Sequence, residues 1–306
     1  MESKTYSTFI IILNWNNFPD TSKCIDSLLK INNPSFKIVI VDNCSDDDSA
    51  ENLRKEFPQL IHLQTTTNLG YAGGMNLGIK FALKNNADFI LISNNDMVYS
   101  KDFFEPLIQT INSSDKIGVV SPKVLYMHDK EKIYCAGGDF NFLRASGVAG
   151  FRNKNTKFYG LVNRKITMAE GSCFLAKREV FERCGLIRED FFMYFEDLEF
   201  SDRVRKYFEI WYCSDSIVYH KGGAGASWSL HSPLYYFYYT RNRYLYFSTF
   251  NFTTRMYVQI YSILISIIKS FSLIISASNK KSNVTLALRN LFEANILGSK
   301  MLWSKY

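Results

Sequence analysis

The chain has 306 residues, of which 47% are hydrophobic and 21% charged, so it can bury a full core and is near the upper size of a single domain. A net charge of +7 and an isoelectric point near 8.9 suit an anionic partner: nucleic acid, a phospholipid surface or a phosphorylated substrate. Aromatic residues make up 16% of the chain. Their concentration in residues 235–247 favours a membrane interface or a sugar-binding surface, so we expect no nucleic-acid partner.

The six cysteines are scattered along the chain and form no Cys-x-x-Cys pair and no Cys/His cluster with zinc-site spacing. We expect reduced thiols, as in a cytosolic protein. The short basic start leads directly into the apolar run 8–13, without the pattern of a signal peptide. A cytoplasmic location is therefore expected.

Strand-like and helix-like periods alternate up to about residue 122, which is typical of βαβ units and a largely parallel sheet. The expected strands cover residues 8–13, 37–41, 60–63 and 88–93. One expected helix begins near residue 20, where Asp20 and its neighbours can cap it. Two further helices are expected at residues 50–57 and 73–83. The predicted fold class is α/β.

The second half of the chain has a looser pattern. It predicts strand fragments at 123–126 and 132–135 and then an irregular insertion over the site at 137–164. Regular structure is expected again in the run 171–176, in helices at 178–184 and 196–206, and in strands at 209–213 and 217–219. The chain after Pro233 is expected to be helical.

Polar side chains stand where apolar, strand-like runs end or meet the next element: Asp42, Asn94-Asn95-Asp96, Glu196-Asp197 after the run 191–195, and His220. The strand ends of an open α/β sheet are where ligands bind. Carboxylates and a neutral imidazole that converge there can hold a divalent cation on a phosphate. One acid then remains to act as a general base.

These residues carry a resemblance to a known family. The runs IILNWN (11–16), VDNCSDD (41–47) and NLGYAGGMNLG (68–78) resemble the donor half of family 2 glycosyltransferases. The runs GSCFLAK (171–177), FFMYFEDLEF (191–200) and HKGG (220–223), with Arg203, are similar to the acceptor half, especially of the rhamnosyltransferase-like branch. The resemblance covers about residues 6–247.

The resemblance implies a GT-A fold, a Rossmann-like mixed sheet flanked by helices, with a helical C-terminal extension. It implies a catalytic domain over residues 1–232, with a donor half at 1–122 and an acceptor half at 123–232, followed by the extension at 233–306. It also implies inverting transfer of a sugar, such as L-rhamnose, from a dTDP- or UDP-linked donor. The acceptor would be a glycan or a polyprenyl-linked intermediate of a bacterial surface polysaccharide.

Inverting transfer needs a base for the acceptor hydroxyl, and Asp197 fits that role. It opens an expected helix whose dipole would stabilise its carboxylate, while Glu196 would tune the pKa of Asp197 or bind the acceptor. The alternative is an ordinary pair of acids in the first turn of a helix.

Asp96 is the expected metal ligand, for Mg²⁺ or Mn²⁺, and the resemblance adds His220 as the second. The family's frequent Asp-x-Asp reads Asn94-Asn95-Asp96 here. Asn94 removes a charge but keeps an acceptor that can contact ribose. A structural role for His220 is the alternative, since a lone histidine after a strand is more often structural.

The remaining candidate residues are expected to contact the donor nucleotide. Asp42 can accept the imide N–H of uracil or thymine, or it can simply cap a turn. The glycines from Gly70 to Gly74 follow the third strand and do not form Gly-x-Gly-x-x-Gly, which argues against a Rossmann dehydrogenase. They would either let the backbone approach the donor phosphates or form a tight turn. Arg203 would reach the diphosphate or remain a solvated charge. The full donor set is Asn14, Asn16, Asp42, Asn68, Gly70, Gly73, Asn76, Asn94, Asn95 and Arg203.

Residues 256–277 are strongly apolar, but Ser262, Ser266, Lys269 and Ser276 fall near one helical face. A membrane-spanning helix would bury Lys269 at a cost of about 2.5 to 3.5 kcal/mol, which an interfacial helix on the inner face of the plasma membrane avoids. Packing on the catalytic domain or in a homodimer is the alternative. Basic residues nearby suit an anionic leaflet: Arg241, Arg243, Arg255, Lys280, Lys281 and Arg289.

Two rival functions remain open beside the transferase. The change to Asn94 makes a non-catalytic nucleotide-sugar-binding scaffold conceivable, but Asp96, Glu196, Asp197 and His220 are intact. A sugar-phosphate nucleotidyltransferase would need a Gly-rich, Arg-containing loop after the first strand, and this chain lacks one there.

Overall fold

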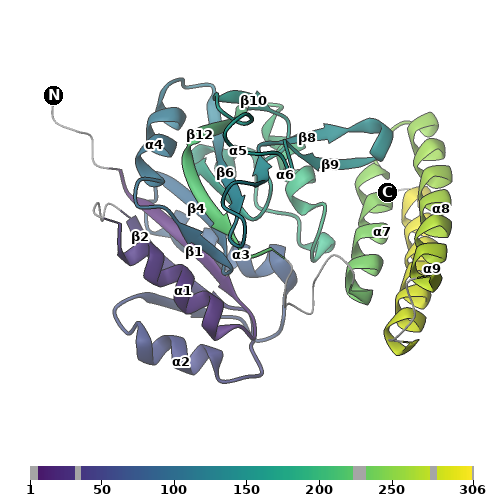
Figure 1. The fold of residues 1–306 in the computed structure, drawn as a ribbon, viewed down its shortest axis with the longest axis horizontal. Coiled ribbons are helices and arrows are strands. Elements are labelled where there is room, and N and C mark those ends of the chain that lie inside the picture. The colour runs from purple at the N-terminus through teal and green to yellow at the C-terminus, as the bar shows by residue number, and fades with distance from the viewer. Residues whose placement is uncertain (1–5, 32–35, 223–231, 276–280, 305–306) are drawn as a thin grey trace. The chain divides into compact units, whose positions relative to one another are not determined.

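The computed structural model describes residues 6–31, 36–222, 232–275 and 281–304, the side chains of 281–283 excepted. The chain divides into two compact units (Figure 1). Unit 1 comprises Met1–Phe140, Gly147–Phe192 and Glu196–Gly222. Unit 2 comprises Asn141–Ser146, Met193–Phe195 and Gly223–Tyr306.

A ten-stranded mixed sheet forms the centre of unit 1, and its main path runs β10-β12-β6-β11-β4-β1-β2-β3, with β5 paired to β12 and β7 to β6. Strands β1 to β4 are parallel, whereas β11 runs antiparallel to both of its neighbours, β4 and β6. The strands are β1 (Thr8–Asn14), β2 (Phe36–Asp42), β3 (Ile61–Gln64), β4 (Phe89–Asn94), β5 (Met97–Tyr99), β6 (Ile117–Tyr126), β7 (Ile133–Ala136), β10 (Arg164–Ile166), β11 (Cys173–Lys177) and β12 (Glu209–His220).

Helices cover both faces of this sheet. They are α1 (Phe18–Leu29), α2 (Ser49–Glu56), α3 (Gly70–Lys84), α4 (Phe104–Asn112), α5 (Arg178–Cys184) and α6 (Glu196–Val204), with a short η2 (Glu189–Phe191). A small separate sheet pairs β8 (Gly138–Asn141) with β9 (Ser146–Ala149), and η1 (Phe142–Arg144) lies between them.

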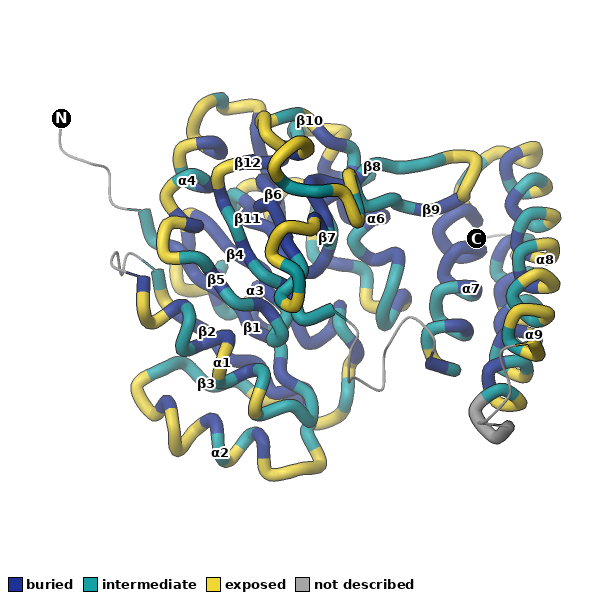
Figure 2. Tube along the Cα trace, viewed as in Figure 1, coloured by how far each residue is buried: buried dark blue, intermediate teal, exposed yellow. Residues whose placement is uncertain are grey.

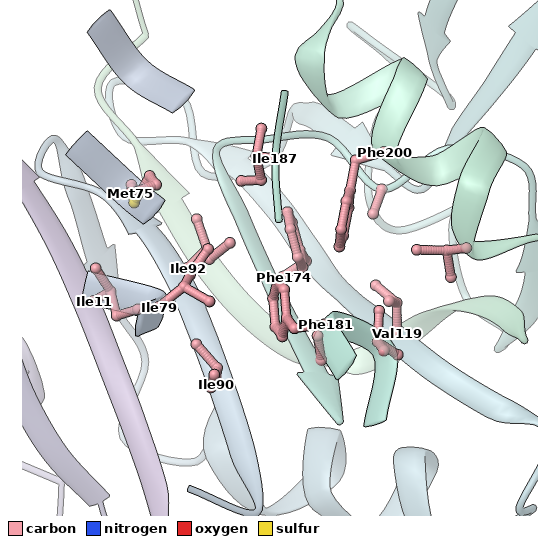
Figure 3. Packing of buried hydrophobic residues seen from close by; sticks show 14 of the residues in the cluster. Ile11, Met75, Ile79, Ile90, Ile92, Val119, Phe174, Phe181, Ile187 and Phe200 are labelled. Atoms are coloured by element: carbon pink, nitrogen blue, oxygen red, sulfur yellow. The ribbon is translucent and has the colours of Figure 1, made fainter. Parts of the chain in front are cut away.

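Strand β1 shows why the sheet is buried on both sides. Successive side chains of a strand point to opposite faces. Phe9 and Ile11 join the core cluster that includes α3, α5 and α6 (Figure 3), whereas Ile10 and Ile12 join the cluster that includes α1 and α4. A continuous apolar run is therefore what a doubly covered strand requires.

Close helix packing on this strand depends on Gly78 of α3. A Cβ at that position would lie 2.4 Å from Ile11 Cγ2, far inside van der Waals contact. The glycine lets α3 lie directly on β1, which fixes where the beginning of α3 meets the strand ends.

Unit 2 is built around the helices α7 (Pro233–Phe247), α8 (Phe252–Ile275) and α9 (Lys281–Trp303). Helix α8 is long and apolar enough to cross a membrane, and in the described residues it is the one helix that meets this test. Its buried residues are small or polar, namely Thr254, Val258, Ser262 and Ser266. Large apolar side chains are exposed along it instead (Figure 2): Met256, Ile260, Ile263, Leu264, Ile267, Ile268, Phe271, Ile274 and Ile275.

The structure corrects several expected elements. Residues 104–112 form α4 and 97–99 form β5, neither of which was expected, while 209–220 form one strand with an irregularity between Cys213 and Ile217. The run 191–195 is not a strand, because Phe192, Tyr194 and Phe195 have φ angles of 62°, 68° and 72°. The insertion 137–164 is more ordered than expected, since it contains β8 and β9.

The aromatic run 235–247 was expected at a membrane interface or a sugar-binding surface, but much of it is core. Tyr236, Tyr244, Tyr246 and Phe247 are all buried. Three residues named in the sequence analysis lie outside the described residues: Gly223 of the HKGG motif, and Ser276 and Lys280 of the expected membrane-binding segment.

Candidate active site

Pairing between β12 and β5 brings together two of the expected site residues. His220 ends β12 and pairs with Met97 of β5, the residue after Asp96. As a result, His220 Nε2 lies 3.1 Å from Asp96 Oδ1, although 124 positions separate the two in the sequence. The backbone closes the same corner, because Lys221 N donates to Asp96 O at 3.1 Å.

The neighbours of His220 fix its ring and change its pKa. Its ring packs edge-on against Tyr134, with centroids 4.4 Å apart, and its Nδ1 is buried without a hydrogen-bond partner among the described residues. Burial acts to lower the pKa of His220, but the hydrogen bond and charge of Asp96 outweigh it and leave the pKa raised.

The Asp96–His220 pair fits a divalent cation as a partial ligand set. No group of three or more His, Cys, Asp or Glu side chains that could hold a metal occurs in the described part of the chain. One or two protein ligands completed by phosphate oxygens are usual for Mg²⁺ sites, and an imidazole ligand also suits transition metals. The pair therefore suits a cation that arrives with, or is completed by, a diphosphate.

The second centre is the acid pair at the start of α6. Asp197 Oδ2 accepts a hydrogen bond from Gly171 N at 3.1 Å, and Asp197 Oδ1 accepts one from Leu198 N at 2.8 Å. Burial raises the pKa of Asp197 to about 6, against the lowering effect of the Gly171 N–H. Burial and the charge of Asp197 raise the pKa of Glu196 well above its ordinary value.

Glu196 also has an unsatisfied oxygen. Its side chain is buried, and Oε2 has no hydrogen-bond partner in the described structure. Environments that push apart the pKa values of two neighbouring acids are typical of acid and base pairs. A hydroxyl group of a bound molecule is the kind of partner that this oxygen could take.

Residues 170–172 join the two centres. Ser172 O accepts from Asn94 N at 2.9 Å, beside the Asp96 turn, and Gly171 N donates to Asp197. The charge of Glu170 contributes to raising the pKa of both Asp197 and His220, so Glu170 faces both centres.

Glu170 and its partner were not among the expected site residues. Arg152 Nη2 lies 3.5 Å from Glu170 Oε1, and the Arg152 guanidinium lies 4.3 Å from the centroid of the Tyr134 ring that packs on His220. The one signal for Glu170 was its place directly before the GSCFLAK run. Arg152 lies in the insertion, where no periodic pattern pointed to it.

The expected nucleotide side lies at the ends of β1 and β2. Asp42 is buried, and its Oδ1 accepts from Asn14 Nδ2 at 2.8 Å and from Ser45 Oγ at 2.6 Å. Its Oδ2 accepts from Ser45 N at 3.0 Å. Asp42 therefore has the contacts of a turn cap, the alternative considered for it, and Asn16 closes the same turn by accepting from Asp46 N at 2.9 Å.

The polar residues beside α3 and β4 differ in how much of their hydrogen-bonding capacity is used. Asn68 Oδ1 accepts from Gly70 N at 2.9 Å, and Asn95 Nδ2 donates to Thr21 Oγ1 at 2.8 Å. No side-chain hydrogen bond of Asn94 is found among the described residues. Gly73 lies in the first turn of α3, where a Cβ would crowd Leu69.

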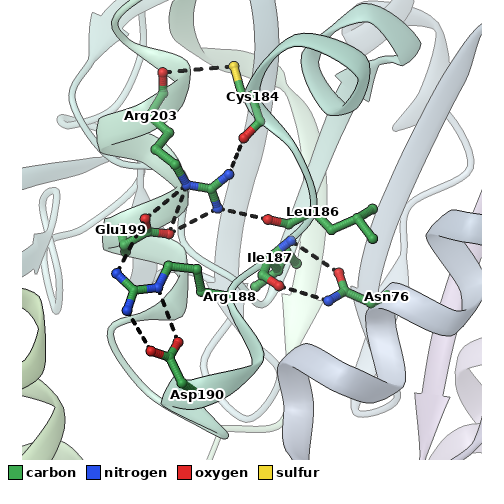
Figure 4. A network of polar contacts seen from close by, with 8 residues as sticks. All are labelled: Asn76, Cys184, Leu186, Ile187, Arg188, Asp190, Glu199 and Arg203. Carbon is green, nitrogen blue, oxygen red and sulfur yellow. Dashed lines mark hydrogen bonds and ion pairs between the residues drawn. The ribbon is translucent and has the colours of Figure 1, made fainter. Parts of the chain in front are cut away.

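Asn76 and Arg203 were expected at the donor, but the structure gives both a structural task (Figure 4). Asn76 is buried, and its amide exchanges hydrogen bonds with the Ile187 backbone at 2.7 and 3.1 Å. The Arg203 guanidinium binds Glu199 at 2.9 Å and also donates to the carbonyls of Cys184 and Leu186. Its donors thus hold the segment between α5 and η2 rather than a phosphate.

Gly70 is required by the turn that precedes the acid pair. It has a φ of +70°, and a Cβ there would lie 2.5 Å from Phe192 O. Tyr71 N donates to the same carbonyl at 2.7 Å. Phe192 itself has a positive φ, so Gly70 supports a strained turn next to Glu196 and Asp197.

Comparisons with known proteins identify the family. The family described as glycosyl transferase family 2 matches residues 9–185. The low-salt glycan biosynthesis hexosyltransferase Agl10 of Haloferax volcanii is 28% identical over 201 residues, which cover 64% of this chain and 61% of that protein. The N-acetylglucosaminyl-diphospho-decaprenol L-rhamnosyltransferase of Mycobacterium tuberculosis is 22% identical over 69% of this chain and 75% of its own length.

Solved structures give the same fold. The mannosyltransferase PcManGT from Pyrobaculum calidifontis, in complex with GDP-Man and Mn²⁺, has a TM-score of 0.57 at 14% identity and covers 98% of this chain and 88% of its own. The expected GT-A fold, a mixed sheet flanked by helices with C-terminal helices after it, is confirmed.

We predict that Gly70→Ala destabilises the protein more than Gly185→Ala does. Both glycines have a positive φ, but a Cβ at Gly185 would lie 3.6 Å from its nearest neighbour. Gly185 has a φ of 78° and a ψ of −179°, so Gly185→Ala should cost only the strain of that backbone conformation, about 1–3 kcal/mol, whereas Gly70→Ala adds overpacking of a further ~1–3 kcal/mol. Urea unfolding measures both, and equal losses would contradict a specific role for the Phe192 contact.

Proposed function

Because the chain belongs to glycosyl transferase family 2, we propose that it is an inverting glycosyltransferase. It moves a sugar from a nucleoside-diphosphate donor to a hydroxyl of a glycan or lipid-linked acceptor. The observation that carries this proposal is the acid pair Glu196–Asp197, held by residues 170–172 beside the Asp96–His220 pair.

Asp197 is the base in this proposal. A direct displacement at the anomeric carbon forms a bond from the acceptor oxygen and breaks the bond to the donor diphosphate, so the acceptor proton must go to the enzyme. With a pKa near 6, Asp197 is ionised at neutral pH and can accept that proton. Glu196, with a raised pKa and an unpartnered oxygen, orients the acceptor hydroxyl.

Asp96 and His220 serve the leaving group. They would hold a divalent cation, Mn²⁺ or Mg²⁺, which when bound supplies positive charge to the departing diphosphate. The Mn²⁺ in the mannosyltransferase complex supports this assignment. Glu170 and Arg152 keep His220 in place through Tyr134.

The names of the relatives suggest a more specific reaction. One relative is named for transfer of L-rhamnose to an N-acetylglucosaminyl-diphospho-decaprenol. We infer that this chain also uses a lipid-linked acceptor in the synthesis of a surface glycan, with L-rhamnose from a dTDP- or UDP-linked donor as the first candidate sugar. The protein would then work on the cytoplasmic face of the plasma membrane.

Helix α8 supports the membrane assignment. Its small and polar residues face inward, where Asn295 Nδ2 donates to Ser266 Oγ at 3.0 Å, and its large apolar residues are exposed. A helix that exposes its apolar face suits an apolar phase. Basic residues of unit 2 would add attraction to anionic lipid.

We predict that Asp197→Asn lowers kcat by about 10² to 10⁴ while donor affinity stays near wild type. The amide keeps size and hydrogen bonding but cannot accept a proton. In the wild type, kcat/KM should rise with pH through about 6, because a raised pKa keeps Asp197 protonated below that value. Steady-state kinetics from pH 4.5 to 8 test this, with Glu196→Gln expected to be less impaired; an active Asp197→Asn enzyme with an unchanged pH profile would refute the assignment.

For the cation, Asp96→Ala should abolish transfer and the Mn²⁺-dependent part of nucleotide binding. Asp102→Ala, which removes an exposed acid outside the site, is the matched control and should behave as wild type. Calorimetric titration of UDP and dTDP with and without Mn²⁺ provides the measurement. Activity that survives EDTA would show that the metal role is wrong.

For the membrane, the double variant Ile267→Glu/Phe271→Glu should lose binding to anionic liposomes in flotation assays, because both side chains are exposed on α8, at 47% and 62%. The control Phe158→Glu/Val162→Glu changes exposed apolar residues of unit 1 and should float normally. If the wild type does not float but forms dimers that the α8 variant loses, the face is a subunit contact.

A further inference from the structure

Two cations of unit 2 share one aromatic ring. The Arg243 guanidinium of α7 lies 5.2 Å from the centroid of the Tyr239 ring, and Lys269 Nζ of α8 lies 5.3 Å from the same centroid. Other tyrosines enclose Lys269, since Tyr235 and Tyr236 lie 5.4 and 5.6 Å from its Nζ. The two helices thus present positive charge into one cluster of rings.

Arg243 is buried, with 2% of its surface exposed. Its Nε donates to Ala145 O at 3.3 Å, and its Nη1 has no hydrogen-bond partner in the described structure. A guanidinium group buried with an unused donor is costly, and contacts with aromatic faces compensate only part of that cost. An acceptor is therefore missing at Nη1.

No carboxylate in the described part of unit 2 compensates these charges. The sequence of unit 2 contains one acidic residue, Glu293, and it pairs with Arg289 at 2.7 Å. The pKa of Lys269 is lowered to about 8 by burial and by the nearby charge of Arg243. The pair has the electrostatics of a site that an anion would complete.

We propose that Arg243 and Lys269 bind the phosphate or diphosphate group of a lipid-linked acceptor. This inference rests on the proposed function and assigns a second subsite to it. Phosphate oxygens would supply the acceptor that Arg243 Nη1 lacks among the described residues and a counter-charge for Lys269, and guanidinium groups match them well.

The neighbours of Lys269 favour a lipid-linked anion over a free one. Ile267 and Ile268, directly before Lys269 on α8, are exposed at 47% and 61%. One helix therefore offers a cation toward the rings and an apolar surface outward, as a prenyl diphosphate requires. Arg243 also lies over the ring of Phe195, 6.0 Å from its centroid.

The test is calorimetric titration of the full chain with farnesyl diphosphate, inorganic pyrophosphate and farnesol. Lys269→Gln should weaken farnesyl diphosphate binding at least about tenfold, and Lys269→Arg should largely restore it. Arg289→Gln removes one exposed charge from the same unit and is the control for general electrostatics. Farnesol should bind weakly to all variants.

Other outcomes overturn the proposal. Equal binding by wild type and Lys269→Gln would remove Lys269 from the site, and pyrophosphate as tight as farnesyl diphosphate would show a free-phosphate site instead. Loss of UDP binding in Lys269→Gln would assign the pair to the donor.

A transfer assay on the same proteins separates this proposal from the proposed function. If the wild type transfers sugar and Lys269→Gln has the same KM for the acceptor, the proposed anion site is wrong but the proposed function stands. If the wild type transfers no sugar but still binds farnesyl diphosphate in a way that depends on Lys269, the proposed reaction is wrong but the anion site stands.

Discussion

The antiparallel position of β11 between β4 and β6 is the constraint on which the candidate site depends. It places residues 170–172 where Ser172 O meets the Asp96 turn and Gly171 N meets Asp197. Without this antiparallel strand, no segment would contact both the Asp96 turn and Asp197 as residues 170–172 do. The parallel strand pairs that the βαβ pattern of the first half predicts do not provide this contact.

Burial raises the pKa values of the acid pair that residues 170–172 hold. Glu196 is buried and Asp197 beside it is half-buried, and the carboxylate of Glu170 is close enough to contribute to the raised pKa of Asp197. Holding such acids together costs free energy, and the strained backbone at Phe192 adds to it. Gly70 and the hydrogen bond from Tyr71 N to Phe192 O secure this turn. Stability given up at a site and compensated by its surroundings is typical of catalytic centres.

Sequence patterns predicted the first four strands and α1 to α3, because apolar strand runs alternate with helix-like segments in this half of the chain. They also predicted that Asp96 and His220 would meet, since Asp96 follows one strand of the sheet and His220 ends another. Other residues could not be assigned in this way. A polar side chain such as Arg203 or Asn76 can bind a ligand or bind backbone carbonyls, and its sequence neighbours do not distinguish the two. Likewise, the aromatic run of α7 looked like a surface, but it packs with α9, where Tyr244 Oη donates to Asn295 Oδ1 at 2.8 Å.

The central claim is that Asp197 activates an acceptor hydroxyl for a single displacement at the anomeric carbon. The most direct measurement is the anomeric configuration of the product, obtained by NMR from the C1–H1 coupling with the nucleotide sugar that stabilises the protein most. The account predicts a configuration opposite to that of the donor. A product that keeps the donor's configuration would contradict it.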